Sequence, residues 1–185
     1  MPPPQSYTRT AIVLHWAIFA LVACGFTLAV YMVGLPLSPQ KLKFFAWHKW
    51  IGVTVFMLAV ARVGWRLAHP APAPPAAMPA WQRRAAKASH ALLYVLLIVI
   101  PITGWLYSSA TGVPTVYLGL VQLPDLLAKD KALAEQLKLV HVTLNYTMLT
   151  LVIVHAAAAL KHHLVDRDDV LRRMLPFGEP SGEQQ

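Results

Sequence analysis

Residues 140–163, VHVTLNYTMLTLVIVHAAAALKHH, place His141 and His155 in an otherwise apolar segment that is long enough to cross a bilayer. An imidazole in hydrocarbon is costly without a partner, so histidines inside a membrane span indicate a functional site. The two histidines are fourteen residues apart, and at about 100° per residue both side chains leave the same face of a helix. The rise between them is about 21 Å, two-thirds of a hydrocarbon core about 30 Å thick. We therefore expect this helix to serve two sites, one near each membrane surface.

The composition of the chain is that of a membrane protein. Hydrophobic residues make up 57% of the sequence and charged residues only 13%, against about 25% charged in ordinary soluble domains. The formal net charge is +8, but the basic residues are scattered between apolar runs, so we do not expect nucleic acid as a partner. The expected surroundings are membrane lipid.

Four segments are expected to span the membrane, which predicts an all-α, integral membrane four-helix bundle. They cover about residues 10–34, 44–67, 89–109 and 139–164. The first is read as a retained span because its apolar run continues far beyond the short core of a signal peptide. Residues 1–176 form a single transmembrane domain in this prediction, and residues 177–185 form a flexible C-terminal tail.

The connections between the spans differ in character. Residues 69–84, HPAPAPPAAMPAWQRR, are expected to form an extended, proline-rich linker. Residues 124–138 are expected to form a short amphipathic helix on the membrane surface. With both termini in the cytoplasm, the inner segments hold every arginine and ten of the 16 Lys and Arg residues, which agrees with the positive-inside rule.

This topology gives each histidine a depth. The first span enters from the cytoplasm and reaches His15 within about two turns, and the fourth leaves past His155, so these two share the inner half. The second span meets His48 in its first turns, and the fourth meets His141 near its start, so these two share the outer half. The sequence thus predicts two pairs of histidines at two depths.

Paired imidazoles on facing helices suit a metal held in the core of a bundle. Zinc needs three or four protein ligands, and the apolar surroundings supply no cysteine or carboxylate to complete such a set. Haem brings four ring nitrogens and needs only two axial ligands, and bis-histidine ligation favours electron transfer over oxygen binding. Two haems about 20 Å apart would form an electron path across the membrane. Taken singly, each histidine could instead be a hydrogen-bonded structural residue or part of a proton relay.

The chain resembles the bacterial cytochrome b-561 family, which are four-helix dihaem proteins of the inner membrane, over residues 7–174. The resemblance rests on motifs at all four helices: YTRTAIVLHW (7–16), WHKWIGVTVFMLAVARVGWRL (47–67), SHALLYVLLIVIPITGW (89–105), and HAAAALKHH (155–163) followed by LRRML (171–175). It implies multi-pass insertion in the inner membrane. It also implies haem b iron ligation by the same four histidines, His15 with His155 and His48 with His141.

Members of this family include a superoxide oxidase, which takes an electron from superoxide at the outer face and delivers it to ubiquinone. By this resemblance, Lys41, Lys43 and Lys49 beside His48 would steer the superoxide anion toward the outer haem. The alternative is that these lysines are interfacial anchors.

The superoxide oxidase activity also requires an inner quinone site. His90 and His162 are the candidates to hydrogen-bond a quinone carbonyl or to relay its protons, and a structural or propionate-binding role is the alternative. Arg62 and Arg66, at the inner end of the second span, could pair with haem propionates. Both arginines could equally be positive-inside anchors.

The predicted function is a dihaem membrane cytochrome b that acts as a superoxide:ubiquinone oxidoreductase. One alternative is a cytochrome b membrane-anchor subunit, which would carry electrons between a dehydrogenase or hydrogenase partner and quinone. An alternative from another class is a haem-free proton or metal transporter that uses the histidines as a relay.

Overall fold

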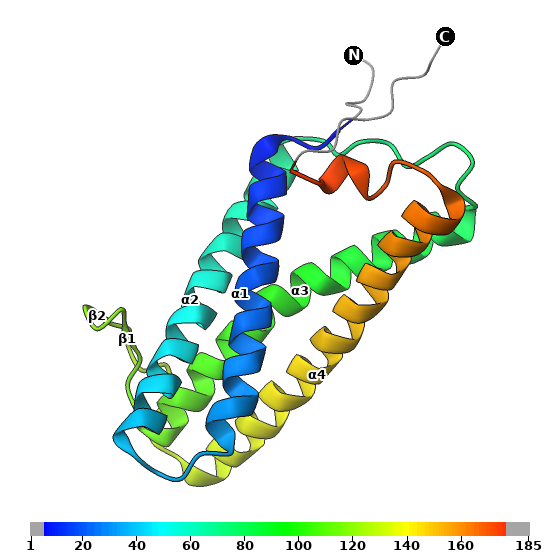
Figure 1. The fold of residues 1–185 in the computed structure, drawn as a ribbon. Helices are drawn as coiled ribbons and strands as arrows, with labels where there is room; N and C mark the ends of the chain where they lie inside the picture. The colour runs from blue at the N-terminus through cyan, green and yellow to red at the C-terminus, as the bar shows by residue number, and fades with distance from the viewer. Residues whose placement is uncertain (1–5, 177–185) are drawn as a thin grey trace.

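The computed structural model describes residues 6–176 and is dominated by four long helices (Figure 1). They are α1 (Arg9–Val33), α2 (Pro39–Ala68), α3 (Ala80–Thr111) and α4 (Lys131–Lys161). A two-stranded antiparallel hairpin, β1 (Val116–Tyr117) and β2 (Val121–Gln122), follows α3, and a π-helical turn η1 (His162–Asp166) and a 3-10 turn η2 (Arg172–Met174) follow α4. All four long helices are apolar and long enough to cross a membrane. The predicted all-α membrane fold is confirmed.

The helices run alternately up and down between two ends of the molecule (Figure 1). At one end α1 and α3 begin and α2 and α4 finish, and we call this the terminal end. At the other end lie the loop between α1 and α2, the β-hairpin and the start of α4, and we call this the hairpin end. The arrangement brings His15, early in α1, to the same end as His155, late in α4.

Side-chain caps fix where three of the helices begin. Thr8 Oγ1 accepts the N–H of residue 11 at 3.3 Å, Ser38 Oγ accepts that of residue 41 at 3.2 Å, and Asp130 Oδ1 accepts that of residue 133 at 3.0 Å. Each oxygen satisfies an N–H that has no partner within its helix. Ser38 is followed by Pro39, which is favourable at the first helical position.

Three helices begin earlier than the sequence predicted. α2 starts at Pro39 instead of residue 44, and α3 at Ala80 instead of 89, so the extended linker covers residues 69–79 and not 69–84. The prediction of a separate amphipathic helix over residues 124–138 was wrong. Residues 124–130 are not helical, and α4 continues unbroken from Lys131. Hydropathy marks the apolar part of a helix, whereas these helices extend beyond it into polar turns.

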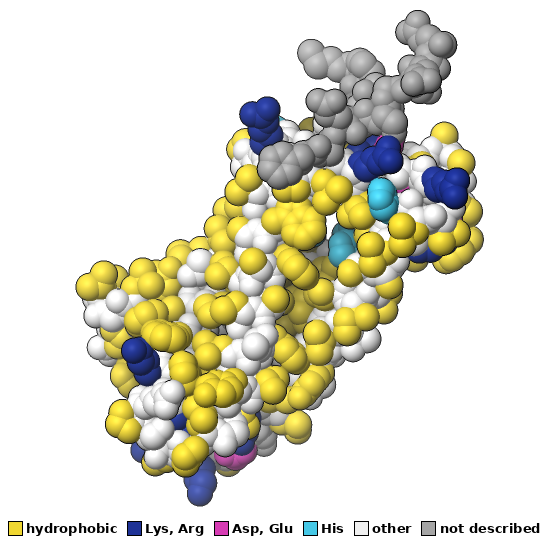
Figure 2. Space-filling view, in the orientation of Figure 1, with side chains coloured by type: hydrophobic (Ala, Val, Ile, Leu, Met, Phe, Trp, Pro, Cys, Tyr) yellow, Lys and Arg dark blue, Asp and Glu magenta, His cyan; other side chains and the backbone are white. Residues whose placement is uncertain are grey.

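Two closely packed helix pairs make up the bundle, α1 with α2 and α3 with α4, and α2 also packs on α3. Leu96 and Ile100 of α3 and Met148 of α4 form the most buried cluster. Elsewhere on the long helices large apolar side chains are exposed, such as Val30 at 61% and Ile153 at 60%. Hydrophobic side chains cover most of the visible flank, and charged groups gather mainly toward the two ends (Figure 2). A surface of this kind is stable against lipid hydrocarbon.

Tryptophan side chains tie the connecting segments to the bundle at both ends. At the hairpin end, Trp50 Nε1 donates to the Val116 carbonyl of β1 at 2.7 Å. At the terminal end, Trp16 Nε1 donates to the Met174 carbonyl of η2 at 2.8 Å. The segment after α4 is therefore anchored to α1 next to His15. The predicted C-terminal tail, residues 177–185, lies outside the described residues.

Candidate functional site

At the hairpin end, His48 of α2 faces His141 of α4, with ring centroids 6.4 Å apart. The Nδ1 atom of His48 lies 3.1 Å from the Gly25 carbonyl, and that of His141 lies 3.1 Å from the Ile100 carbonyl. A carbonyl oxygen can only accept, so each Nδ1 carries the proton and each Nε2 keeps a free lone pair. Metal-binding histidines are typically oriented by this kind of hydrogen bond.

Two residues of α3 adjust the position of His141. Thr103 Oγ1 donates to the Ile100 carbonyl at 2.8 Å and accepts from His141 Nδ1 at 3.0 Å. A Cβ atom on Gly104 would lie 3.0 Å from Cε1 of His141, closer than side chains normally approach. Glycine at position 104 therefore makes room for the His141 ring. We call His48, His141 and these two α3 residues the hairpin-end site.

At the terminal end, three imidazoles meet. His15 of α1 and His155 of α4 have ring centroids 6.2 Å apart, and His90 of α3 lies 5.2 Å from His155. The charge of the Arg62 guanidinium acts on all three rings. Arg62 is held by a 3.1 Å hydrogen bond from its Nε to the hydroxyl of Tyr94. We call these five residues the terminal-end site.

The ring spacing of both pairs fits two imidazoles that would hold one metal ion between them. With a metal–nitrogen distance of about 2.0 Å and about 1.1 Å from nitrogen to ring centre, two opposed imidazoles have centroids about 6.2 Å apart. The observed separations are 6.4 and 6.2 Å.

A metal with protein ligands alone fits poorly at either pair. Within residues 6–176, three potential ligands of the His, Cys, Asp and Glu types converge only at His162, Asp166 and Asp168, which are separate from both pairs. A zinc ion at the hairpin-end pair would thus lack a third protein ligand, and at the terminal end the ligand atoms of His15, His155 and the third imidazole, His90, do not all lie within 4.8 Å of one another. Haem supplies its own equatorial nitrogens, so the residues present fit haem. Four apolar helices with opposed histidine pairs are typical of the class of membrane-bound b-type cytochromes.

Comparison with known proteins agrees with this class. Residues 6–177 match the family described as prokaryotic cytochrome b561. The chain is 35% identical over 179 residues to "Cytochrome b561 homolog 2" of Escherichia coli strain K12, a match that covers 93% of this chain and 92% of the relative. It is 28% identical over 176 residues to "Probable superoxide oxidase CybB" of Yersinia pestis, covering 93% and 97%. The chain belongs to the prokaryotic cytochrome b561 family of haem-binding, electron-transferring membrane proteins, which leaves the haem-free transporter without support.

The three lysines expected to steer superoxide lie at the hairpin end and each has a local partner. Lys41 Nζ donates to two carbonyls at the end of α1, at 2.6 and 3.4 Å. Lys49 Nζ donates to two carbonyls just after α3, at 3.1 and 3.2 Å. Lys43 Nζ lies 4.9 Å from the ring centroid of Trp47. Lys41 and Lys49 therefore help to hold the segments after α1 and α3 in place, whereas Lys43 contacts only the aromatic ring of Trp47.

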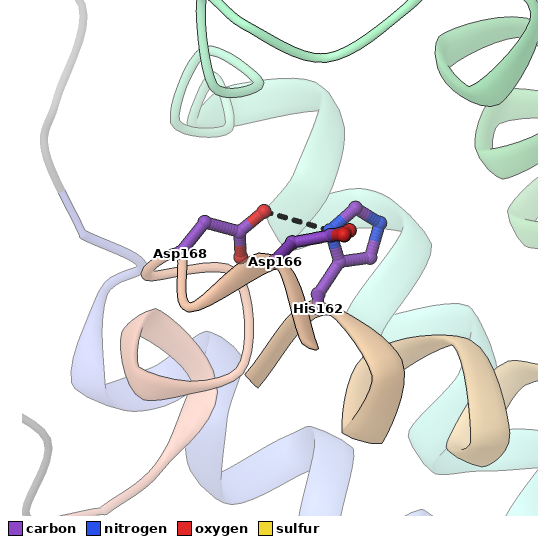
Figure 3. Close-up of side chains that lie close together, drawn as sticks. All are labelled: His162, Asp166 and Asp168. Atoms are coloured by element: carbon purple, nitrogen blue, oxygen red, sulfur yellow. Dashed lines mark hydrogen bonds and ion pairs between the residues drawn. The ribbon is translucent and has the colours of Figure 1, made fainter. Parts of the chain in front are cut away.

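The two predicted quinone residues are found in different surroundings. His90 lies against His155, whereas Nδ1 of His162 in η1 lies 2.7 Å from Asp168 and 3.1 Å from Asp166 (Figure 3). Arg66, in the last turn of α2, acts electrostatically on His90. The structure thus gathers His90 into the terminal-end site and gives His162 carboxylate partners that the sequence analysis did not name.

Sequence reasoning also missed Thr103 and Tyr94. Both are polar side chains inside an apolar helix, which is a signal that they meet a polar group. Their partners, His141 and Arg62, come from other helices, so only the packing of the bundle identifies them.

Proposed function

We propose that this protein holds two b-type haems, one between His48 and His141 and the other between His15 and His155. The observation that carries the proposal is the pair of imidazole separations, 6.4 and 6.2 Å, at two levels of one helix. When bound, haem supplies a centre that takes up and releases single electrons. The chain sets the distance between the two centres because His141 and His155 share α4.

We also propose that the protein lies in the bacterial inner membrane with its terminal end, and so both termini, in the cytoplasm. The beginning of α1, the end of α2, the beginning of α3 and the segment after α4 carry all of the arginines. Arginine and lysine in short loops favour the cytoplasmic side. The hairpin-end site then faces the periplasm.

The proposed electron donor at the hairpin end is superoxide. The relative from Yersinia pestis is named a probable superoxide oxidase. Lys41, Lys43 and Lys49 place three positive charges around the start of α2, next to His48. A positive potential at the entry point raises the rate at which a small anion arrives.

The proposed acceptor at the terminal end is ubiquinone, with His90 and His162 as the candidate residues for its carbonyl oxygens and protons. Two superoxide anions each lose one electron and become O₂, while one ubiquinone takes two electrons and two protons and becomes ubiquinol. The protons come from the cytoplasm, where imidazoles can pass them on. His162 has one nitrogen held by Asp168, which leaves Nε2 for this task.

Arg62 and Arg66 are the proposed partners of haem propionates at the terminal end. The Arg62 guanidinium donates through Nε to Tyr94 and through Nη1 to the Ala11 carbonyl at 3.4 Å. Arg66 lies one turn further along the same helix. After these two hydrogen bonds the Arg62 guanidinium still has N–H donors for a propionate. Charge-assisted hydrogen bonds to carboxylates are among the strongest hydrogen bonds in proteins.

The activity can be tested with purified haem-loaded protein in vesicles that contain ubiquinone. Superoxide generated outside should disappear faster than its spontaneous dismutation allows, and ubiquinol should form with two superoxide consumed per quinol. Unchanged superoxide decay, with haem that stays oxidised, would contradict this function. Reduction of the haem only after addition of a copurifying dehydrogenase or hydrogenase subunit would instead identify a membrane-anchor cytochrome.

A further inference from the structure

We propose that His162, Asp166 and Asp168 form a binding site for a divalent transition-metal ion, with Zn²⁺ as the natural probe. The three side chains converge at the terminal end of the molecule, just beyond α4 (Figure 3). Their potential ligand atoms all lie within 4.8 Å of one another. His162 is also a candidate quinone residue, through Nε2; the metal would use Nδ1, and a zinc-binding test needs neither superoxide nor quinone.

The local backbone is what brings the three residues together. After α4 the chain widens into the π-helical turn η1, and Arg167 then adopts a left-handed conformation with φ of 54°. The N–H of Asp168 bonds back to the His162 carbonyl at 3.1 Å. The chain reverses here, so a carboxylate from within the turn and one from just beyond it face the same imidazole.

The cluster contains more carboxylate oxygens than its N–H groups can satisfy with hydrogen bonds. Two carboxylate oxygens approach the single Nδ1 of His162, at 2.7 Å from Asp168 and 3.1 Å from Asp166. One N–H can serve only one of them fully. Lys161 Nζ reaches the same oxygen of Asp166 at 2.6 Å and supplies one positive charge against two negative charges. With His162 neutral, these four side chains together carry one net negative charge, while Arg167 and Arg172 line the pocket next to Asp168. A divalent cation would use both carboxylates and the imidazole at once.

The set of donor atoms defines the kind of metal. One imidazole nitrogen and two carboxylate oxygens suit Zn²⁺ or Mn²⁺, and the Irving–Williams order places Zn²⁺ above Mn²⁺. Magnesium and calcium prefer oxygen ligands alone. Three protein ligands leave one position of a zinc ion to water. The side chains of His162, Asp168 and Asp166 are 13%, 18% and 29% exposed, so the cluster lies at the surface and is reachable from the aqueous phase.

Lys161 provides a direct test, because its ammonium group competes with a metal for Asp166. If the cluster binds a cation, removing this positive charge should strengthen binding. If the carboxylates only orient His162, removing it should have no such effect. An increase in metal affinity in the Lys161→Gln variant is therefore expected for a metal site and not for a purely structural cluster.

The experiment is equilibrium dialysis of chelator-treated, haem-loaded protein against Zn²⁺, with the haem spectrum as the check that the protein is intact. Wild type should bind one Zn²⁺ that Mg²⁺ does not displace. Asp168→Asn should weaken binding about tenfold or more, and Lys161→Gln should tighten it about threefold or more. Asp169→Asn is the matched control, since Asp169 pairs with Arg172 and lies outside the cluster, and it should bind as wild type does.

Three results would overturn the proposal. They are the absence of saturable Zn²⁺ binding in wild type, an Asp168→Asn variant that binds as tightly as wild type, and a Lys161→Gln variant that binds more weakly. The second result would assign any bound zinc to other surface histidines. X-ray absorption at the zinc edge should show a single imidazole among oxygen neighbours, and two or more imidazoles would contradict this ligand set.

Discussion

The two histidine pairs, each with one member on α4, have nearly the same spacing but very different surroundings. At the hairpin-end site, backbone carbonyls orient both rings, and Thr103 and Gly104 shape the space around one of them. At the terminal-end site, a third imidazole and the Arg62 guanidinium lie beside the pair. The same helix therefore places one histidine in a site that backbone carbonyls orient and another in a polar site beside a positively charged guanidinium.

The geometry of the hairpin-end site depends most on Gly104. Gly104→Val should displace the His141 ring, because even a Cβ would lie 3.0 Å from its Cε1. We expect the haem content to fall from two toward one per protein, measured by pyridine haemochrome. The matched control is Gly34→Val at the end of α1, where a Cβ would be in ordinary contact with the Tyr31 carbonyl at 3.7 Å, and it should keep both haems. A Gly104→Val protein with two haems and unchanged spectra would contradict this view of the site.

The charge at the terminal-end site should appear in its redox potential. A positive guanidinium stabilises the reduced haem, so Arg62→Gln should lower the potential of one haem by on the order of 50 mV. The other haem should hardly change. Spectroelectrochemical titration measures both, with Arg84→Gln at the exposed start of α3 as the control. Equal shifts in the redox potentials of both haems would contradict the view that Arg62 acts on one site only.

Thr103 should have a smaller effect on the hairpin-end site. Thr103→Val removes the hydroxyl that accepts from His141 Nδ1, but the Ile100 carbonyl remains as an acceptor. The loss of one hydrogen bond amounts to about 1 kcal/mol, so both haems should stay bound and the potential of one should shift slightly. Low-temperature paramagnetic resonance of the oxidised protein should show an altered signal for one haem only. Loss of that haem would mean that the carbonyl alone does not orient the ring.

The smallest expected effect belongs to Lys43. Unlike Lys41 and Lys49 it donates to no backbone carbonyl in the described chain, so Lys43→Gln removes charge with little change in structure. Superoxide oxidation should slow about twofold at low ionic strength, and the difference should vanish at high salt because exposed charges are screened. A salt-independent loss would indicate a structural defect. An unchanged rate at low salt would leave Lys43 without a steering role.

The sequence predicted much of the fold because hydropathy and alternating topology are strong constraints in a membrane. The four spans and the depth of each histidine follow from apolar runs and from the reversal of the chain at each loop. The sequence did not predict the early starts of α2 and α3, since the first turns of both helices are polar; the start of α2 depends on the single side chain of Ser38, and α3 has no side-chain cap. It also missed the β-hairpin, whose two-residue strands depend on contacts such as Trp50 with Val116.

The candidate site was also predicted only in part from the sequence. The opposition of His15 to His155 and of His48 to His141 could be predicted, because one helical period and one topology determine it. The position of His90 against His155 and the link from Arg62 to Tyr94 could not, since they depend on the rotation of α3 within the bundle. The grouping of His162 with Asp166 and Asp168 depends on a π-helical turn and a left-handed residue, which no hydropathy pattern predicts.

The central claim is that the two histidine pairs hold two separate haems. The most direct test is haem quantification together with redox titration of wild type, His141→Ala and His155→Ala. Wild type should contain two haems b, and each variant should contain one, with the two variants retaining haems of different potential. Wild type with a single haem, or either variant with two, would contradict the account.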